Sequence, residues 1–139
     1  MTKAKMAKEA IVRIDSQPGA LARLARGMAD RSINIDAVIA TAEGAGAVVQ
    51  LVSGDHQRLM DALRELRLEA QETRVVLVEG EHRPGLLQSI AEKLARENIG
   101  LLYLYATAVT VDRCLVVISS TNNEWAVMVL NSPGAASRY

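Results

Sequence analysis

The stretch that decides the fold is Asp15-Ser16-Gln17-Pro18-Gly19-Ala20-Leu21, and a second version of it reads Glu81-His82-Arg83-Pro84-Gly85-Leu86-Leu87. Each version follows a short apolar run, 10–14 or 75–78, and precedes apolar residues at helical spacing. This order predicts a strand that turns through a Pro-Gly corner into a helix. Because a helix start presents unpaired backbone N–H groups and the positive end of the helix dipole, each corner is a candidate site for a small anion.

The two corners belong to an internal repeat with an offset of 66 positions (85 − 19). Comparison of residues 10–53 with 76–119 gives eleven identities in 44 positions without a gap, and the last identity pairs Ser53 with Ser119. Chance gives about one identity in fifteen positions at ordinary composition. The repeat therefore indicates that one supersecondary unit has been duplicated.

The first copy predicts strands at 10–14, 32–42 and 48–52, and an extended segment at 70–80 that is shared with the second copy. Leu21, Leu24, Ala25 and Met28 predict the buried stripe of the first helix. Asp55 is suited to cap a second helix. The order β-α-β-β-α-β is that of a ferredoxin-like unit, in which both helices cover one face of an antiparallel sheet.

The second copy predicts strands at 101–107 and 114–119 and a final helix that carries Trp125, Met128 and Val129. Its helix after the corner carries Leu86, Leu87, Ile90, Ala91 and Leu94. The offset places a last strand from residue 135, which is short or absent and would leave a sheet edge exposed. We therefore expect a disordered lead-in at 1–8, one domain at 9–74 and another at 75–139.

Composition excludes several classes of function. Sixteen basic residues balance sixteen acidic ones and aromatics are only 3%, so neither nucleic acid nor an anionic membrane is an expected partner. No apolar run is long enough to span a membrane, and the basic N-terminus lacks the apolar segment of a signal peptide. The single cysteine, Cys114, lies in an apolar run and is expected to be a buried thiol. One cysteine allows no disulfide framework, which is typical of a reducing, cytoplasmic compartment. Neither histidine pairs with a cysteine at metal-ligand spacing, and no phosphate loop or dinucleotide motif occurs, so we expect no metal and no cofactor.

The corner and the residues that follow it resemble the ACT domain. The resemblance is carried by Asp15, Pro18-Gly19, Leu21 and Ile33-Asn34-Ile35, and again by Pro84-Gly85, Leu87 and Ile99. The run 103–106 and the join 72–78 are similar to those of small proteins made of two tandem ACT domains, and the resemblance covers about 9–131. It implies two ferredoxin-like βαββαβ units whose sheets pair side by side with the helices on one face.

The resemblance also implies a binding site for a small molecule, commonly an amino acid, at a domain–domain interface. Carried over to this sequence, the ligand-binding residues are Ser16, Gln17, Pro18, Gly19, Ala20 and Leu21, faced by Asn34, Ile35 and Asp36. The chemistry is suitable, since backbone N–H groups bind a carboxylate and Asn34 or Asp36 accepts from an ammonium. A purely structural role of the corner, with Asn34 capping or turning the chain, is the alternative.

The second corner departs from the family pattern, because Gly100 stands where the family tends to have asparagine. Its site is either degenerate, which we favour, or tuned to another ligand. The corresponding residues are His82, Arg83, Pro84, Gly85, Leu86, Leu87, Gly100 and Leu101. A test of the first corner is Gly19→Ala or Gly19→Val, which should block a ligand while leaving the fold intact.

The resulting hypothesis is a non-enzymatic regulatory protein that binds an amino-acid-like ligand at the interface of its two ACT domains. The alternative is a ligand-free dimerising interaction module or a regulatory subunit of a metabolic enzyme. We expect a homodimer, because the short last strand leaves a sheet edge exposed and Trp125 and Tyr103 add apolar surface. The same topology hosts acylphosphatases and RNA-recognition domains. Arg83 lacks the partner asparagine that an acylphosphatase has. The sheet aromatics that an RNA-recognition domain needs would be limited to Tyr103 and Tyr105.

Overall fold

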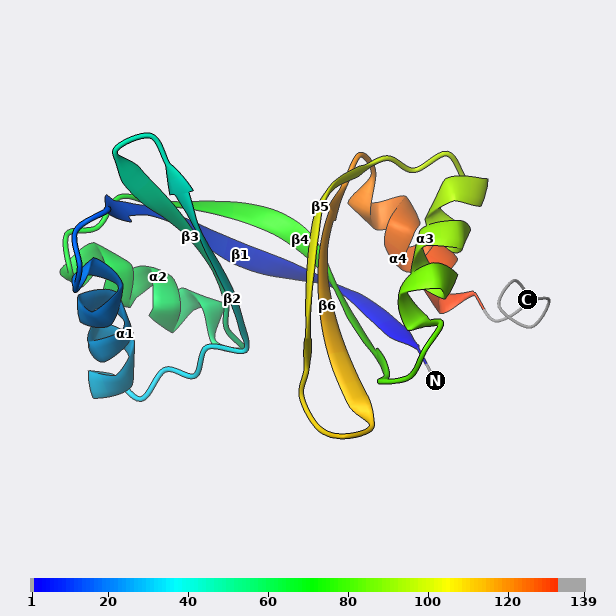
Figure 1. The fold of residues 1–139 in the computed structure, drawn as a ribbon, viewed down its shortest axis with the longest axis horizontal. Helices are drawn as coiled ribbons and strands as arrows, with labels where there is room; N and C mark the ends of the chain where they lie inside the picture. Colours follow the sequence, from blue (N-terminus) through cyan, green and yellow to red (C-terminus); the bar gives the residue numbers. More distant parts are fainter. Residues whose placement is uncertain (1, 133–139) are drawn as a thin grey trace. The chain divides into compact units, whose positions relative to one another are not determined.

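The computed structural model describes residues 2–132, which form four helices and a six-stranded antiparallel sheet (Figure 1). The fold is α+β, as the sequence predicts. The strand order is β2-β3-β1-β4-β6-β5. In chain order the elements are β1 (Lys3–Asp15), α1 (Ala20–Asp30), β2 (Ala37–Glu43), β3 (Gly46–Val52), α2 (His56–Glu65), β4 (Ala70–Glu81), α3 (Leu86–Arg96), β5 (Leu101–Ala108), β6 (Arg113–Ser120) and α4 (Asn123–Asn131).

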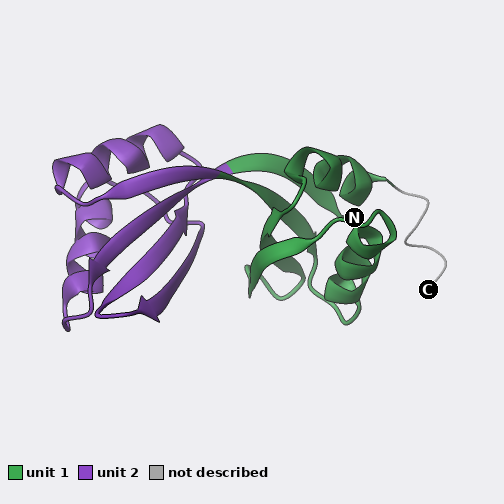
Figure 2. Ribbon diagram, turned by 90° about the horizontal axis from the view of Figure 1, so that it is seen from above, with its two compact units in different colours: residues 1–7, 74–139 green, residues 8–73 purple. Residues whose placement is uncertain are grey.

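Two compact units divide the chain, and Figure 2 colours them separately. The N-terminal unit consists of residues 8–73, and the C-terminal unit consists of residues 1–7 together with 74–139. Strands β1 and β4 are long enough to contribute to both units. Within the N-terminal unit the strand order is β2-β3-β1-β4, and α1 and α2 lie on one face of these strands.

The C-terminal unit has the strand order β1-β4-β6-β5, with α3 and α4 on one face. Its strand beside β4 is the first part of β1, residues 3–7, and not a segment from the end of the chain. The expectation that residues 1–8 are a disordered lead-in is therefore wrong for the described part of that segment. Ala4 is buried in the core of this unit, and Met6 packs against the core. The last strand that we expected from residue 135 lies outside the described residues.

The side chain of Asn131 holds the first part of β1 in place. Its Oδ1 accepts from the backbone N–H of Ala4 at 2.8 Å, and its Nδ2 donates to the carbonyl of Ala4 at 2.9 Å. A side-chain amide thus supplies the donor and acceptor that a further strand would have supplied. Since an open sheet edge is a hazard for aggregation, this contact protects the first part of β1 at Ala4.

The buried face of α1 differs from the prediction, and α4 presents some of its apolar residues outside the core. Helix α1 buries Ala20, Leu24, Gly27 and Met28, whereas Leu21 is 46% exposed and Ala25 is exposed. Helix α4 buries Ala126 and Leu130, whereas Trp125 is 40% and Met128 is 63% exposed. The apolar residues in these helices cover more than one face, so spacing alone did not decide which of them meets the core.

The gapless alignment of the two copies is wrong beyond the turn that joins β5 to β6, which corresponds to the turn between β2 and β3. Glu43 pairs with Gly46 across a two-residue turn, whereas Val109 donates to the carbonyl of Arg113 across three residues, 110–112. The partner of Ser53 is consequently Ser120 and not Ser119. Both serine hydroxyls accept, at 3.3 Å, from the backbone N–H of the residue that caps the following helix, Asp55 or Asn122.

Candidate functional site

Both Pro-Gly corners are type II β-turns. In the first, the N–H of Ala20 donates to the carbonyl of Gln17 at 3.2 Å, and Gly19 has φ 95° and ψ −14°. In the second, the N–H of Leu86 donates to the carbonyl of Arg83 at 3.3 Å, and Gly85 has φ 98° and ψ −10°. Proline presets the second position of such a turn, and glycine adopts the positive φ of the third position without strain.

Each turn leads into a helix whose first turn is not capped by a side chain. Gly19 and Gly85 are the N-cap residues of α1 and α3, and neither helix has a side-chain cap hydrogen bond. A Cβ atom built on either glycine would have no atom within 4 Å, so the backbone at each corner is open. This arrangement leaves backbone N–H groups of the first helical turn available to an anionic group.

The left-handed φ of Gly19 affects the substitution that the sequence suggested as a test. An L-residue side chain in this region costs roughly 1–2 kcal/mol. Gly19→Ala and Gly19→Val therefore strain the turn as well as covering the backbone, and neither leaves the fold unaffected. Asparagine tolerates positive φ better than alanine or valine, so Gly19→Asn is the better probe.

The remaining residues of the two corners are mostly exposed. Ser16, Gln17 and Pro18 are exposed and Ala20 is buried, while His82, Arg83 and Pro84 are exposed and Leu86 is half-buried. The hydroxyl of Ser16 donates to the carbonyl of Ala45 at 2.7 Å. Arg83 is paired with Glu81, with 3.1 Å between Nε and Oε2. Leu21 and Leu87 were expected on the buried faces of their helices, but both are exposed beside their corners.

The register of the N-terminal unit places Asn34, Ile35 and Asp36 far from the first corner. Gly46 of β3 pairs with Asp15, at the end of β1, whereas Val52 pairs with Ala37, at the start of β2. Six residues of β3 separate these two positions, which is about 20 Å along a strand. The predicted facing residues and the corner are therefore at opposite ends of this unit.

The second copy has the same arrangement. Glu81 pairs with Arg113 at one end of β6, and Leu101 pairs with Ser120 at the other. The backbone N–H of Gly100 donates to Thr121 Oγ1 at 2.9 Å. Gly100 and Leu101 thus lie at the opposite end of β6 from the corner that starts at Glu81.

A hollow of about 350 Å³ opens beside the first corner. Its lining comes from the end of β1, the start of α1 and the segment after α2, and consists of Arg13, Ile14, Asp15, Ala20, Arg23, Leu24, Leu66 and Leu68. Only Asp15 and Ala20 belong to the stretch that the sequence singled out. Of the eight, only Ala20 is among the ligand-binding residues that the sequence predicted. Sequence reasoning missed the other seven as site residues, and no spacing signal connects Leu66 and Leu68 with the corner.

Within residues 2–132, no group of three or more His, Cys, Asp or Glu side chains could hold a metal ion. Over the same residues, no helix combines the length and the apolar character that crossing a membrane requires.

The one cysteine of the sequence, Cys114, is buried in β6 as a free thiol.

The chain is similar in structure to several solved proteins. Protein BT0572 from Bacteroides thetaiotaomicron matches with a TM-score of 0.84 and 23% identity, over 91% of this chain and 88% of that one. The regulatory subunit of aspartate kinase from Thermus thermophilus, in a ligand-free form, matches with a TM-score of 0.66 and 17% identity, over 93% of both chains. Aspartokinase alpha and beta subunits match with a TM-score of 0.56 and 20% identity, over 92% of this chain and 94% of that one.

At these identities the similarity shows the fold, which is ACT-like. A comparison with protein-family models finds no match, and no curated protein sequence matches the chain.

Proposed function

We propose that the chain is a non-enzymatic regulatory protein of two tandem ACT units, and that it senses an amino-acid-like ligand at an interface between ACT units. The observation that carries the proposal is the pair of open, uncapped type II corners. The fold supports it, because a regulatory subunit of aspartate kinase shares this architecture. We place the protein in the cytoplasm and consider a metabolic enzyme as the partner that it regulates.

The chemistry of the first corner suits the backbone of an amino acid. N–H groups at the start of α1 bind the α-carboxylate, and the helix dipole adds to the attraction. Within the N-terminal unit Asn34 and Asp36 lie at the other end of the sheet. A ligand at the corner of this unit therefore has its α-ammonium bound by a residue other than Asn34 and Asp36.

The second corner is the degenerate one in this proposal. Arg83 is already paired with Glu81, and a Cβ on Gly80 would meet the side chain of Leu86 at 2.8 Å. At the second corner, Leu86 thus fills the space over Gly80 and the charge of Arg83 is already paired, although the backbone of both corners is open.

A thermal-shift screen of the purified protein against the twenty L-amino acids and the matching 2-oxo acids tests this function. A ligand at a hundredfold over its Kd stabilises the folded state by about 2.7 kcal/mol, which raises the Tm by several degrees. A shift for one chemical group of compounds identifies the ligand. A flat panel contradicts ligand sensing and favours the ligand-free interaction module, for which the exposed Leu21 and Leu87 would form part of the contact surface.

Gly19→Asn and Gly85→Asn form a matched pair for locating the ligand. Both glycines have nearly the same positive φ and an equally open Cβ position, so the two substitutions strain the fold alike. We expect Gly19→Asn alone to lose the thermal shift. Equal loss in both variants would contradict the assignment of the ligand to the first corner.

A further inference from the structure

We propose that the hollow in the N-terminal unit selects an amino acid with an aliphatic side chain, with Arg23 binding its carboxylate and Asp15 its ammonium. The inference rests on the part of the proposed function that concerns sensing of an amino-acid-like ligand. It names the ligand class, and it moves the binding site from an interface between units into the N-terminal unit. It differs from the family's expected site at a domain interface, because all eight lining residues belong to one unit.

The size and lining of the hollow suit a small aliphatic group. About 350 Å³ is near the lower end of ordinary ligand pockets. Five of the eight lining residues are aliphatic and come from three separate segments: Ile14 of β1, Ala20 and Leu24 of α1, and Leu66 and Leu68 after α2. An aliphatic side chain placed here leaves water for apolar surroundings, which is favourable.

The charged residues of the lining have opposite signs, which suits a zwitterion. Arg13 already donates to Glu43 Oε1 through Nη1 at 2.6 Å. Across residues 2–132, neither Arg23 nor Asp15 has a side-chain partner. An unpaired guanidinium can bind a carboxylate through two parallel hydrogen bonds, and an unpaired carboxylate can accept from an ammonium.

The second copy replaces several lining residues of the hollow, although it keeps an acid, Glu81, where the first copy has Asp15. Leu86 stands where the first copy has Ala20, and its side chain lies over Gly80, which corresponds to Ile14. Ser89 replaces Arg23, and Glu79 replaces Arg13. The small residue at position 20 and the cation at position 23 are thus features of the first copy. Ala20→Leu and Arg23→Ser convert these two positions into those of the second copy.

Isothermal titration of the full chain tests the proposal with three probes: L-leucine, 4-methylpentanoate (leucine without its ammonium group) and L-aspartate. We expect the unmodified protein to bind L-leucine, to bind 4-methylpentanoate about tenfold more weakly, and not to bind L-aspartate. A loss of one charged hydrogen bond corresponds to about tenfold in Kd or more. Equal affinity for L-leucine and 4-methylpentanoate, or binding of L-aspartate alone, would overturn the assigned ligand class.

Two variants copy the second corner. Arg23→Ser should weaken L-leucine binding about tenfold, since it removes a charge-assisted pair, and Ala20→Leu should abolish it by filling the hollow. Arg26→Ser is the control, because Arg26 is exposed on the same helix and does not line the hollow. If Ala20→Leu does not fold, Arg23→Ser at the solvent-facing rim still tests whether the hollow binds L-leucine.

The outcomes separate this inference from the function on which it rests. If the protein binds L-leucine but both variants bind it unchanged, the hollow is not the site and amino-acid sensing stands. If no amino acid in the wider thermal-shift panel binds, both proposals fall.

Discussion

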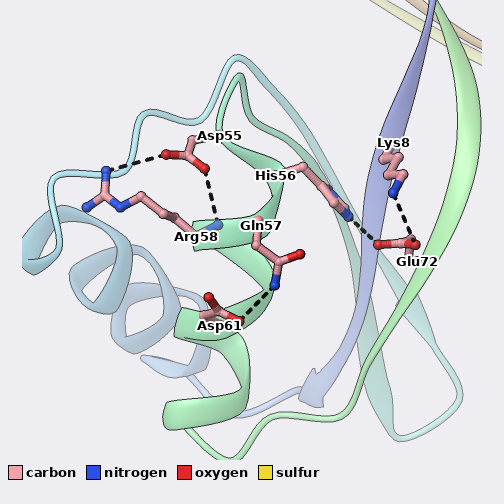
Figure 3. A network of polar contacts seen from close by, with 7 residues as sticks. All are labelled: Lys8, Asp55, His56, Gln57, Arg58, Asp61 and Glu72. Carbon is pink, nitrogen blue, oxygen red and sulfur yellow. Dashed lines mark hydrogen bonds and ion pairs between the residues drawn. The ribbon is translucent and has the colours of Figure 1, made fainter.

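At the scale of single residues, His56 links the start of α2 to β4 (Figure 3). Its Nε2 lies 2.7 Å from Glu72 Oε1, and Glu72 Oε2 lies 3.7 Å from Lys8 Nζ. The hydrogen bond from His56 lowers the pKa of Glu72 below its ordinary value, partial burial opposes this, and the charges of Lys8 and His56 add to the lowering. The carboxylate of Glu72 is thus favoured in the folded protein.

This contact predicts a loss of stability in acid. Because the pKa of Glu72 is lower in the folded than in the unfolded chain, its contribution is complete above the ordinary glutamate value of about 4.3 and is lost as the pH falls through the lower folded value. The Tm difference between the unmodified protein and Glu72→Gln should therefore be largest above about pH 5 and shrink towards about pH 3. Thermal unfolding at a series of pH values measures it.

Glu69→Gln is the control for this pH series, since Glu69 is an exposed glutamate just before β4. Its Tm difference should stay small at every pH. A Glu72→Gln difference that does not change between pH 7 and pH 3 would contradict the coupling of Glu72 ionisation to folding.

The residues beside the corner show what the sequence could predict at this scale. Pro18 and Gly19 predicted a turn, because only particular residues suit a type II turn. The assignment of Leu21 to the core was wrong. Ala20 is the buried residue and begins α1, and a small alanine gives a weaker hydrophobic signal than the leucine beside it.

At the scale of elements, β1 joins the two units because it continues further towards the N-terminus than the apolar run at 10–14 indicates. Lys3 and Lys5 are exposed, Ala4 is buried and Met6 is half-buried. This is the alternation of a strand with one face covered. The pattern was present in the sequence, but two lysines and a small alanine made it weak.

The two hydrogen bonds from Asn131 to Ala4 should determine how firmly this part of β1 is held. Asn131→Ala removes both hydrogen bonds to Ala4, each of which contributes about 1 kcal/mol. We expect the Ala4 amide to exchange with solvent about tenfold faster in this variant, as measured by amide hydrogen exchange under native conditions. The rest of the C-terminal unit should keep its protection.

Asn131→Asp separates the two bonds of this contact. It keeps the oxygen that accepts from the Ala4 N–H and removes the Nδ2 donor, so the Ala4 amide should remain more protected than in Asn131→Ala. Unchanged exchange of Ala4 in Asn131→Ala would show that β4 alone holds the first part of β1.

The β5–β6 hairpin shows a limit of sequence comparison at the element scale. The extra residue of its turn moves the correspondence from an offset of 66 to 67. Ser119 and Ser120 are both serine, so an alignment without a gap still found an identity at the wrong position. Only the strand register and the two helix caps reveal the shift.

At the scale of the whole molecule, the sequence predicted the α+β fold and the two corners but not the hollow. The fold follows from repeated local signals, each of which lies within a few residues. The hollow depends on Leu66 and Leu68 meeting the start of α1, which is a contact between segments more than forty positions apart. It also depends on the small size of Ala20, which has meaning only once Leu86 is seen to lie over Gly80.

Exposed apolar side chains indicate which unit would form a homodimer. Of the large hydrophobic residues that are exposed within 2–132, only Leu21 and Val38 belong to the N-terminal unit. The others belong to the C-terminal unit and are Leu87, Leu101, Leu102, Val109, Val111, Trp125 and Met128. The open edge that first suggested dimerisation is occupied by residues 3–7, so these side chains now carry the expectation.

We predict a homodimer that is formed through the C-terminal unit. Light scattering coupled to size-exclusion chromatography should give twice the 15.0 kDa mass of one chain, and Met128→Lys or Leu102→Lys should shift the protein towards monomer, because each buries a charge in an apolar contact. Val38→Lys, on an exposed apolar residue of the other unit, is the control and should leave the mass unchanged. A monomer at millimolar concentration would exclude the dimer, and loss of the dimer in Val38→Lys alone would place it on the N-terminal unit.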